Sequence, residues 1–179
     1  GGSSGISATG DQFLNQDSPN FSSSCEAGDA FGTALASGDF DHDGRSDLAI
    51  GVPRDDFGSS PDGGVVHVIY GSSTGLNTGE VDYWHEDVPG IADSAEAYDL
   101  FGQALAAGDF DDDGYDDLAI SNTRETVNGA LSAGAVHVLY GGSGGLSAAG
   151  SQYLFQGPGG LLGGGSANFG SALAAGDFD

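Results

Sequence analysis

The sequence predicts an all-β fold built from repeated four-stranded antiparallel units, and three observations support this class. The phrase that begins Gly38-Asp39-Phe40-Asp41 returns at Gly108-Asp109-Phe110-Asp111 and starts again at Gly176. The apolar runs are short, rich in Val, Ile, Leu and Tyr, and bounded by Gly, Asp, Asn or Pro, which is typical of strands. Glycine supplies 34 of 179 residues without the period of collagen, as expected for tight turns.

The repeat also sets the size of each unit. Phe101 follows Phe31 by 70 positions and Phe169 follows Phe101 by 68, and each is followed by Gly and then by an Ala-Leu-Ala run. The match extends beyond the acidic phrase, since residues 64–71 correspond to residues 134–141. A repeat of this length divides the chain into stacked units rather than one irregular domain.

Four strands are expected in each complete unit. In the first unit they lie near residues 31–37, 47–52, 64–70 and 81–86, and in the second near residues 101–107, 117–121, 134–140 and 152–156. The innermost strands consist of small residues that suit a crowded position. Four antiparallel strands with a small innermost strand describe a propeller blade, so we expect a partial β-propeller.

The expected organisation is two complete blades flanked by two fragments. The complete blades cover residues 31–100 and 101–168, and residues 169–179 begin a truncated third blade. Residues 1–30 are interpreted as the outer strand of a preceding blade plus a linker, because Asp11–Asp17 corresponds to Val81–Asp87. A closed propeller typically takes 4–8 blades, so we expect further blades from a longer chain or from neighbouring copies.

Composition limits the partners and the location. The net charge is −24, from 27 acids against Arg45, Arg54 and Arg124, with no lysine. Nucleic acid is excluded as a partner, because phosphate binding needs clustered cations. No apolar run approaches the roughly 18 residues of a membrane span, and no signal peptide opens the chain. We expect an internal or processed piece of an extracellular or cell-surface protein.

The recurring acidic loop between the first and second strands is the main candidate site. Carboxylates stand at positions 1, 3, 5 and 9, and a glycine at position 6 permits the turn. Ca²⁺ takes six to eight oxygen ligands, which these carboxylates and the backbone carbonyl at position 7 would supply. The predicted Ca²⁺ ligands are Asp39, Asp41, Asp43, Arg45 and Asp47 in the first loop, Asp109, Asp111, Asp113, Tyr115 and Asp117 in the second, and Asp177 and Asp179 in the third.

Other interpretations of the loop fit less well. An EF-hand needs an acid at position 12 and flanking helices, but Ile50 and Ile120 occupy that position inside strand-like runs. No thiolate or converging imidazole is offered in the loops, so zinc, copper and iron are poor candidates there. Solvated acidic turns would not explain the same spacing and glycine twice.

The sequence resembles the FG-GAP repeat family, the units of integrin alpha-subunit propellers and of many bacterial secreted proteins. Phe31-Gly32 together with Gly51-Val52-Pro53 resembles the motif that names the family. The second unit keeps Phe101-Gly102 but has Ile120-Ser121-Asn122 where Gly-Ala-Pro would be expected. The resemblance implies a Ca²⁺-stabilised propeller of the seven-bladed type, used in adhesion or recognition of a protein or glycan ligand.

An enzyme is not expected within these residues. His67 and His137 repeat at equivalent strand positions, which favours a structural role over paired catalytic bases. No Gly-x-Ser-x-Gly nucleophile turn occurs. Tyr83 and Trp84 could stack on a sugar, but their apolar counterparts in the other units favour packing between blades.

Two functions therefore stay open: a calcium-dependent extracellular adhesion or structural module, able to assemble through open blades, and the non-catalytic propeller portion of a larger secreted hydrolase. Two further features do not separate these functions. Cys25 is single, and Asn20-Phe21-Ser22 fits the glycosylation acceptor pattern.

Overall fold

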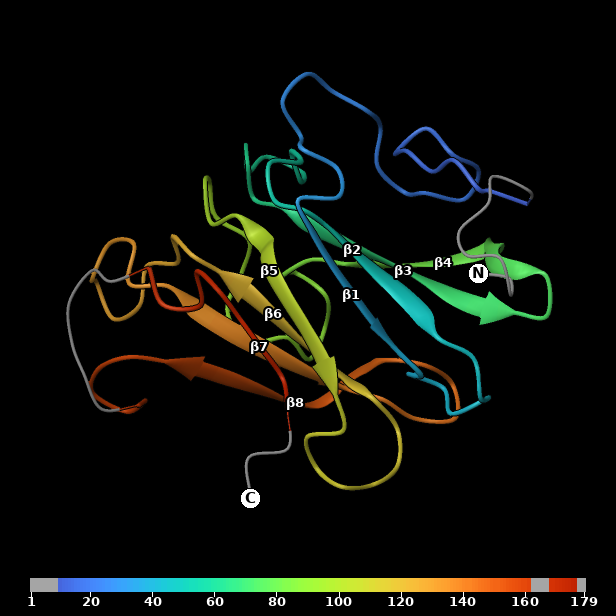
Figure 1. Cartoon of the computed structure of the whole chain (residues 1–179). Coiled ribbons are helices and arrows are strands. Elements are labelled where there is room, and N and C mark those ends of the chain that lie inside the picture. The colour runs from blue at the N-terminus through green and yellow to red at the C-terminus, as the bar shows by residue number, and fades with distance from the viewer. Residues whose placement is uncertain (1–9, 162–167, 177–179) are drawn as a thin grey trace.

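The computed structural model describes residues 10–161 and 168–176 of the chain. The described residues contain two four-stranded antiparallel sheets and no helix, and in each sheet strand order follows chain order (Figure 1). The predicted all-β class with four-stranded blades is confirmed. The first sheet holds β1 (Ala34–Gly38), β2 (Asp47–Val52), β3 (Val65–Ser72) and β4 (Gly75–Trp84), and the second holds β5 (Phe101–Gly108), β6 (Asp117–Asn122), β7 (Ala135–Tyr140) and β8 (Ser147–Phe155).

The two sheets share one strand register. Ile50 of β2 lies opposite His67 of β3, and Ile120 of β6 lies opposite His137 of β7. Each residue of the second pair stands 70 positions after its counterpart in the first pair. The repeat in the sequence is therefore also a repeat in three dimensions, and equivalent side chains can be compared directly.

The outer strands begin earlier than predicted. β4 starts at Gly75 and β8 at Ser147, whereas the predicted outer strands covered residues 81–86 and 152–156. The first half of β4 is mostly exposed and lacks an apolar pattern, so backbone pairing rather than burial holds it in the sheet. Such a segment gives no periodic signal in the sequence.

The N-terminal segment before β1 contains no strand in its described part, so the outer strand predicted at Asp11–Asp17 does not form. Side chains of this segment instead meet the exposed half of β4. The Gln12 amide donates to the Leu76 carbonyl and accepts from the Leu76 N–H, both at 2.9 Å. The Asn20 amide donates to the Thr78 carbonyl at 2.7 Å. The segment is thus tied to the first blade by side chains.

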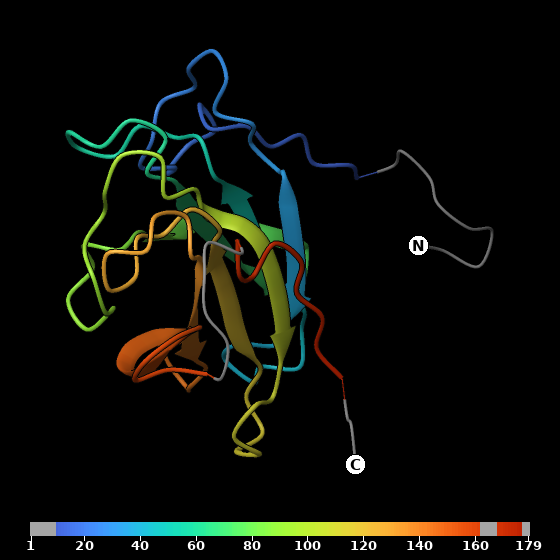
Figure 2. The same ribbon diagram turned by 90° about the vertical axis from the view of Figure 1, so that its left-hand side faces the viewer.

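The two blades dock through their inner strands. β1 and β5 lie side by side in Figure 1 and again in the turned view of Figure 2. Phe101 of β5 is fully buried in the same apolar cluster as Val66 and Trp84 of the first blade. The Phe101 N–H donates to the Gly63 carbonyl at 2.9 Å. A Cβ at Gly64 would lie 2.4 Å from the Phe101 carbonyl oxygen, so only glycine permits this approach.

The described residues after the second sheet repeat this docking. The Phe169 N–H donates to the Ala133 carbonyl at 2.9 Å, as the Phe101 N–H donates to Gly63. Phe169 and Leu173 are partly buried against the second sheet. The inner strand predicted near residues 169–179 is not formed in its described part, because no described strand lies beside it as β6 lies beside β5.

The repeated histidines are core residues, as the sequence predicts. His67 and His137 are fully buried, and their rings lie 5.2 Å and 4.9 Å from the rings of Tyr83 and Tyr153. Trp84 is 8% exposed in the core shared by both blades, which confirms the packing interpretation over exposure to a sugar. Within residues 10–161 and 168–176 there is no helix that is long and apolar enough to cross a membrane.

We predict that Gly64→Ala destabilises the chain far more than Gly58→Ala. Both glycines have positive φ, 85° and 60°, but nothing lies within 4 Å of a Cβ at Gly58. The control should lose about 1 kcal/mol for its backbone conformation alone, whereas Gly64→Ala should lose about 2–4 kcal/mol because the blades must separate. Urea denaturation measures both, and equal losses would contradict the docking geometry.

We also predict that His67 weakens the fold in acid. Burial lowers the pKa of His67 from 6.5 to about 4, so the unfolded chain takes up a proton first as pH falls. The stability from neutral His67 is complete above pH 6.5 and is lost between pH 6.5 and 4, by up to about 3 kcal/mol. His67→Gln should flatten the pH dependence of the unfolding free energy in this window. An unchanged slope would count against a buried neutral imidazole.

Candidate metal centre

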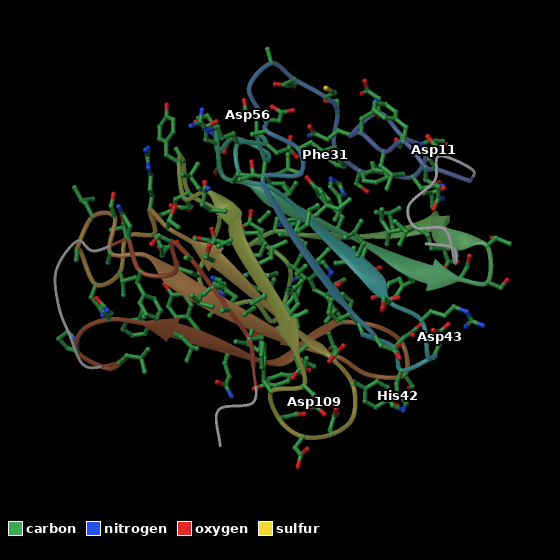
Figure 3. The ribbon with its side chains drawn as sticks, viewed as in Figure 1. Asp11, Phe31, His42, Asp43, Asp56 and Asp109 are labelled. Atoms are coloured by element: carbon green, nitrogen blue, oxygen red, sulfur yellow. The ribbon has the colours of Figure 1, made fainter. Side chains whose placement is uncertain are left out.

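The two acidic loops connect β1 to β2 and β5 to β6, and both lie at the same end of the blades. Figure 3 shows His42 and Asp43 of the first loop near Asp109 of the second. The loops touch, because the His42 and Tyr115 rings lie 5.4 Å apart. The structure therefore places the predicted sites next to the junction between the blades.

The first loop brings three of its four carboxylates together. Asp39, Asp41 and Asp43 each offer an oxygen within 4.8 Å of the others. The Asp43 and Gly44 N–H groups donate to the two oxygens of Asp39, at 2.9 and 3.0 Å. Gly44 has a φ of 85° with no atom near a Cβ position, so it serves the turn rather than a close contact. Backbone N–H groups thus hold the carboxylates in place.

The fourth carboxylate of the first loop acts as a clamp. Asp47 is 1% exposed, and its two oxygens accept from the Phe40 N–H and the Gly71 N–H, both at 2.8 Å. These bonds join the start of the loop to the end of β3. Burial raises the pKa of Asp47, and the two backbone donors oppose that rise. Asp47 lies outside the tight group of three.

The second loop repeats the design with one difference. Asp109, Asp111 and Asp117 have oxygens within 4.8 Å of one another, whereas Asp113 lies outside the tight group. Asp117 accepts from the Phe110 N–H at 2.7 Å and from the Gly141 N–H at 2.8 Å, as Asp47 does in the first blade. Each loop therefore gathers three of the four predicted carboxylates, but the missing one differs.

The residues at position 7 distinguish the loops. The Arg45 side chain donates to the Asp43 carboxylate at 2.6 Å, so the first loop carries a cation of its own. Tyr115 takes that position in the second loop, which has no such ion pair among the described residues. The predicted ligand role of both residues, through their backbone carbonyls, stays a prediction. Asp177 and Asp179 lie outside the described residues.

The donor set fits a hard divalent cation. Carboxylate oxygens converge without a thiolate or imidazole, which is the ligand chemistry of Ca²⁺ and Mg²⁺. The carboxylates also repel one another, and Asp41 and Asp39 add to the rise in the pKa of Asp47 that burial causes. A cation between them would offset this repulsion.

The first loop also joins the blades. The Gly142 N–H of the second blade donates to the Phe40 carbonyl at 3.0 Å. The Asp39 N–H donates to the Asp116 carboxylate at 2.8 Å, and the Asp116 N–H returns a bond to the Asp39 carbonyl at 3.2 Å. Phe40 is fully buried, whereas its counterpart Phe110 is 42% exposed. In the second loop, Phe110 is therefore partly exposed to solvent, whereas its counterpart Phe40 in the first loop packs against the other blade.

Sequence analysis missed a buried acidic cluster between the blades. Oxygens of Glu86, Asp99 and Glu125 lie within 4.8 Å of one another, and each residue is at most 3% exposed. Burial raises the pKa of Glu86 and of Glu125, and their mutual repulsion adds to the rise for Glu86. One sequence feature could have revealed this cluster: Glu86 stands at the position where the other units have Gln16 and Gln156.

Comparisons with known proteins agree with the repeat geometry. The sequence profile of the FG-GAP repeat matches residues 31–69 and 101–139. The first match begins just before β1 and ends in β3, and the second begins with β5 and ends in β7. The profile thus covers the acidic loop twice.

Three relatives illustrate the similarity. Phosphatidylinositol-glycan-specific phospholipase D from Bos taurus is 33% identical over 110 residues, which is 62% of this chain and 13% of the relative. Integrin alpha-PS5 from Drosophila melanogaster is 36% identical over 96 residues, 52% of this chain and 9% of the relative. Integrin alpha-6 from Gallus gallus is 30% identical over 100 residues, 55% of this chain and 8% of the relative.

The chain therefore spans about an eighth or less of the length of these relatives. Within that span, the repeated Phe-Gly start, the acidic loop and the four-stranded sheets coincide with the two profile matches. The chain contains two FG-GAP repeats, at residues 31–69 and 101–139, each folded as a propeller blade.

Proposed function

We propose that this chain is a calcium-stabilised propeller module of an extracellular or cell-surface protein, with a role in adhesion. The observation that carries the proposal is the double loop, in which three carboxylates converge beside the junction of the blades. The proposed ligands are the aspartates at loop positions 1, 3, 5 and 9, of which three converge in each loop, and the carbonyls of Arg45 and Tyr115. Extracellular fluid supplies Ca²⁺ at the concentration that weak sites of this kind need.

Calcium would act here as a structural ion. The loop carboxylates are fixed by backbone N–H groups, and the same loop donates and accepts hydrogen bonds across the blade junction. A cation that binds the ordered loop stabilises the folded state by mass action. It would also make the orientation of the two blades more rigid, because Asp39 belongs both to the cation site and to the junction.

We propose further blades as the partners of this module, from the same polypeptide or from neighbouring copies. Phe110 and Leu35 are 42% and 60% exposed, whereas their counterparts in the junction, Phe40 and Leu105, are 0% and 8% exposed. Each outer face thus repeats one half of the observed junction. A neighbouring blade with the same sequence pattern would cover these two exposed side chains. A protein or glycan ligand would then bind to the assembled propeller.

A second candidate function is the non-catalytic propeller portion of a larger hydrolase. It is favoured by the similarity to phosphatidylinositol-glycan-specific phospholipase D, whose name describes an enzyme. In this case the blades would frame or position a catalytic domain outside the chain. Binding of the calcium-loaded chain to an extracellular protein or glycan would favour the adhesion module. Association of the chain with a hydrolase domain would favour the propeller portion of a hydrolase.

We predict that millimolar Ca²⁺ raises the melting temperature of the chain by about 5 °C, from about 0.4–1.4 kcal/mol of binding free energy per loop. Asp41→Asn together with Asp111→Asn should remove most of this rise, because each loses a ligand charge. Differential scanning calorimetry with and without chelator measures it.

The matched control for the second loop is Asp112→Asn, which removes one charge, as Asp111→Asn does, from a loop position outside the converging group. Asp112 has a φ of 61°, a conformation that asparagine also tolerates. The control should keep the calcium response. A response that survives in the double variant would place the ions elsewhere and contradict the proposal.

A further inference from the structure

We infer that Glu86, Asp99 and Glu125, with Asn122 and His137, form a second metal site, which holds a first-row divalent transition ion between the blades. This site is separate from the calcium loops and does not depend on the proposed function. Its ligands come from the linker between β4 and β5, from β6, from the loop after β6 and from β7. An ion here would fasten the exit of the first blade to the sheet of the second.

The first argument is an excess of buried acceptors. The Asn122 amide N–H₂ donates to Glu86, and also to Glu125 at 3.3 Å. Glu86 Oε2, Glu125 Oε1 and Asn122 Oδ1 have no hydrogen-bond partner among the described residues. No lysine or arginine side chain of the described chain forms an ion pair with this cluster. Buried carboxylates without partners are costly, so a positive charge is expected among them.

The second argument is an imidazole aimed into the cluster. His137 is fully buried, and its Nε2 lies 3.5 Å from Glu86 Oε1. Both ring nitrogens lack a hydrogen-bond partner within the described part of the chain. A neutral imidazole offers a lone pair to a metal ion. Imidazole combined with carboxylates favours Zn²⁺ or Mn²⁺ over Ca²⁺, which prefers oxygen ligands alone.

The equivalent place in the first blade is the internal control. There Gln16 replaces Glu86, and its amide donates to Asp55 and to Ser23, both at 3.3 Å. The Ser23 hydroxyl in turn lies 3.0 Å from Nε2 of His67. That cluster joins its amide, hydroxyl, carboxylate and imidazole through its own hydrogen bonds, which leaves only Asp55 Oδ2 and His67 Nδ1 without a partner among the described residues.

The change from Gln16 to Glu86 therefore removes an amide donor and adds a charge at one site of the repeat. Ser23 is likewise replaced by Asp93, which removes a hydroxyl that partners the histidine. Asp93 itself is exposed and accepts from the Tyr153 hydroxyl, so the second blade leaves the histidine without the hydroxyl partner that Ser23 gives His67. Asn122, which replaces Val52, restores one amide donor, and acceptors of Glu86, Glu125 and Asn122 still lack a partner among the described residues.

The test uses Zn²⁺ as the probe and Glu86→Gln as the variant, which restores the residue type of the first blade. Both chains are refolded with Zn²⁺ and excess Ca²⁺, passed through a sizing column in Ca²⁺ buffer, and measured by elemental analysis. We expect the wild-type chain to keep about one more Zn²⁺ than the variant, because a buried ion escapes slowly while the exposed loops exchange Zn²⁺ for Ca²⁺. Equal Zn²⁺ content would overturn the inference.

Two further measurements keep the test decisive. Glu80→Gln, the same change at an exposed position of β4, should retain Zn²⁺ like the wild type. Nitrogen-detected NMR should show a Zn²⁺-dependent shift of the His137 ring and none of the His67 ring. A shift of neither ring would contradict the site. If Glu86→Gln fails to fold by circular dichroism, Glu125→Gln replaces it, with the same expected loss of Zn²⁺.

Discussion

The structure depends on a buried carboxylate that closes each blade on itself. Asp47 accepts two backbone N–H bonds, one from the start of the acidic loop and one from the end of β3, and Asp117 repeats the arrangement. An ionised carboxylate makes these bonds stronger than neutral ones. The loop is therefore held to the sheet at both ends before any cation binds. With this backbone fixed, three aspartates converge in each loop, and in the second loop the clamp residue Asp117 is one of them.

The same clamp places the first loop where it can join the two blades. Once Asp47 fixes Phe40, the Phe40 carbonyl accepts from Gly142 and its ring is buried in the shared core. At the opposite end of the inner strands, Phe101 lies against Gly63 and Gly64. The linker from β4 to β5, which ends at Phe101, carries Glu86 and Asp99 into the interior. The loop end, the docking glycine and the buried acids are thus three consequences of one repeated blade geometry.

Sequence could predict the inner and middle strands of the two complete repeats and could not predict what depends on tertiary pairing. The inner and middle strands, the acidic loops and the structural role of His67 and His137 all follow from residues that recur. The early start of β4 was missed because its polar residues have no apolar period and are held by backbone pairing and by the Gln12 and Asn20 side chains. A strand was predicted at Asp11–Asp17 because these residues resemble β4, but no described strand lies beside them. The Glu86 cluster was missed because its members are scattered from residue 86 to residue 137. Only the fold shows that Asp113, unlike Asp43, stands apart from its group.

Hydrogen exchange of single amides in Asp47→Asn tests the central claim most directly. If the Asp47 clamp positions the loop and the loop positions the second blade, the amides of Phe40 and Gly71 should exchange faster, since each loses a charged acceptor. The Gly142 amide should also exchange faster, although it belongs to the other blade and never touches Asp47. The Gly141 amide, bound to the intact Asp117 clamp, should be much less affected. Faster exchange of Phe40 and Gly71 with Gly142 unchanged would contradict the account.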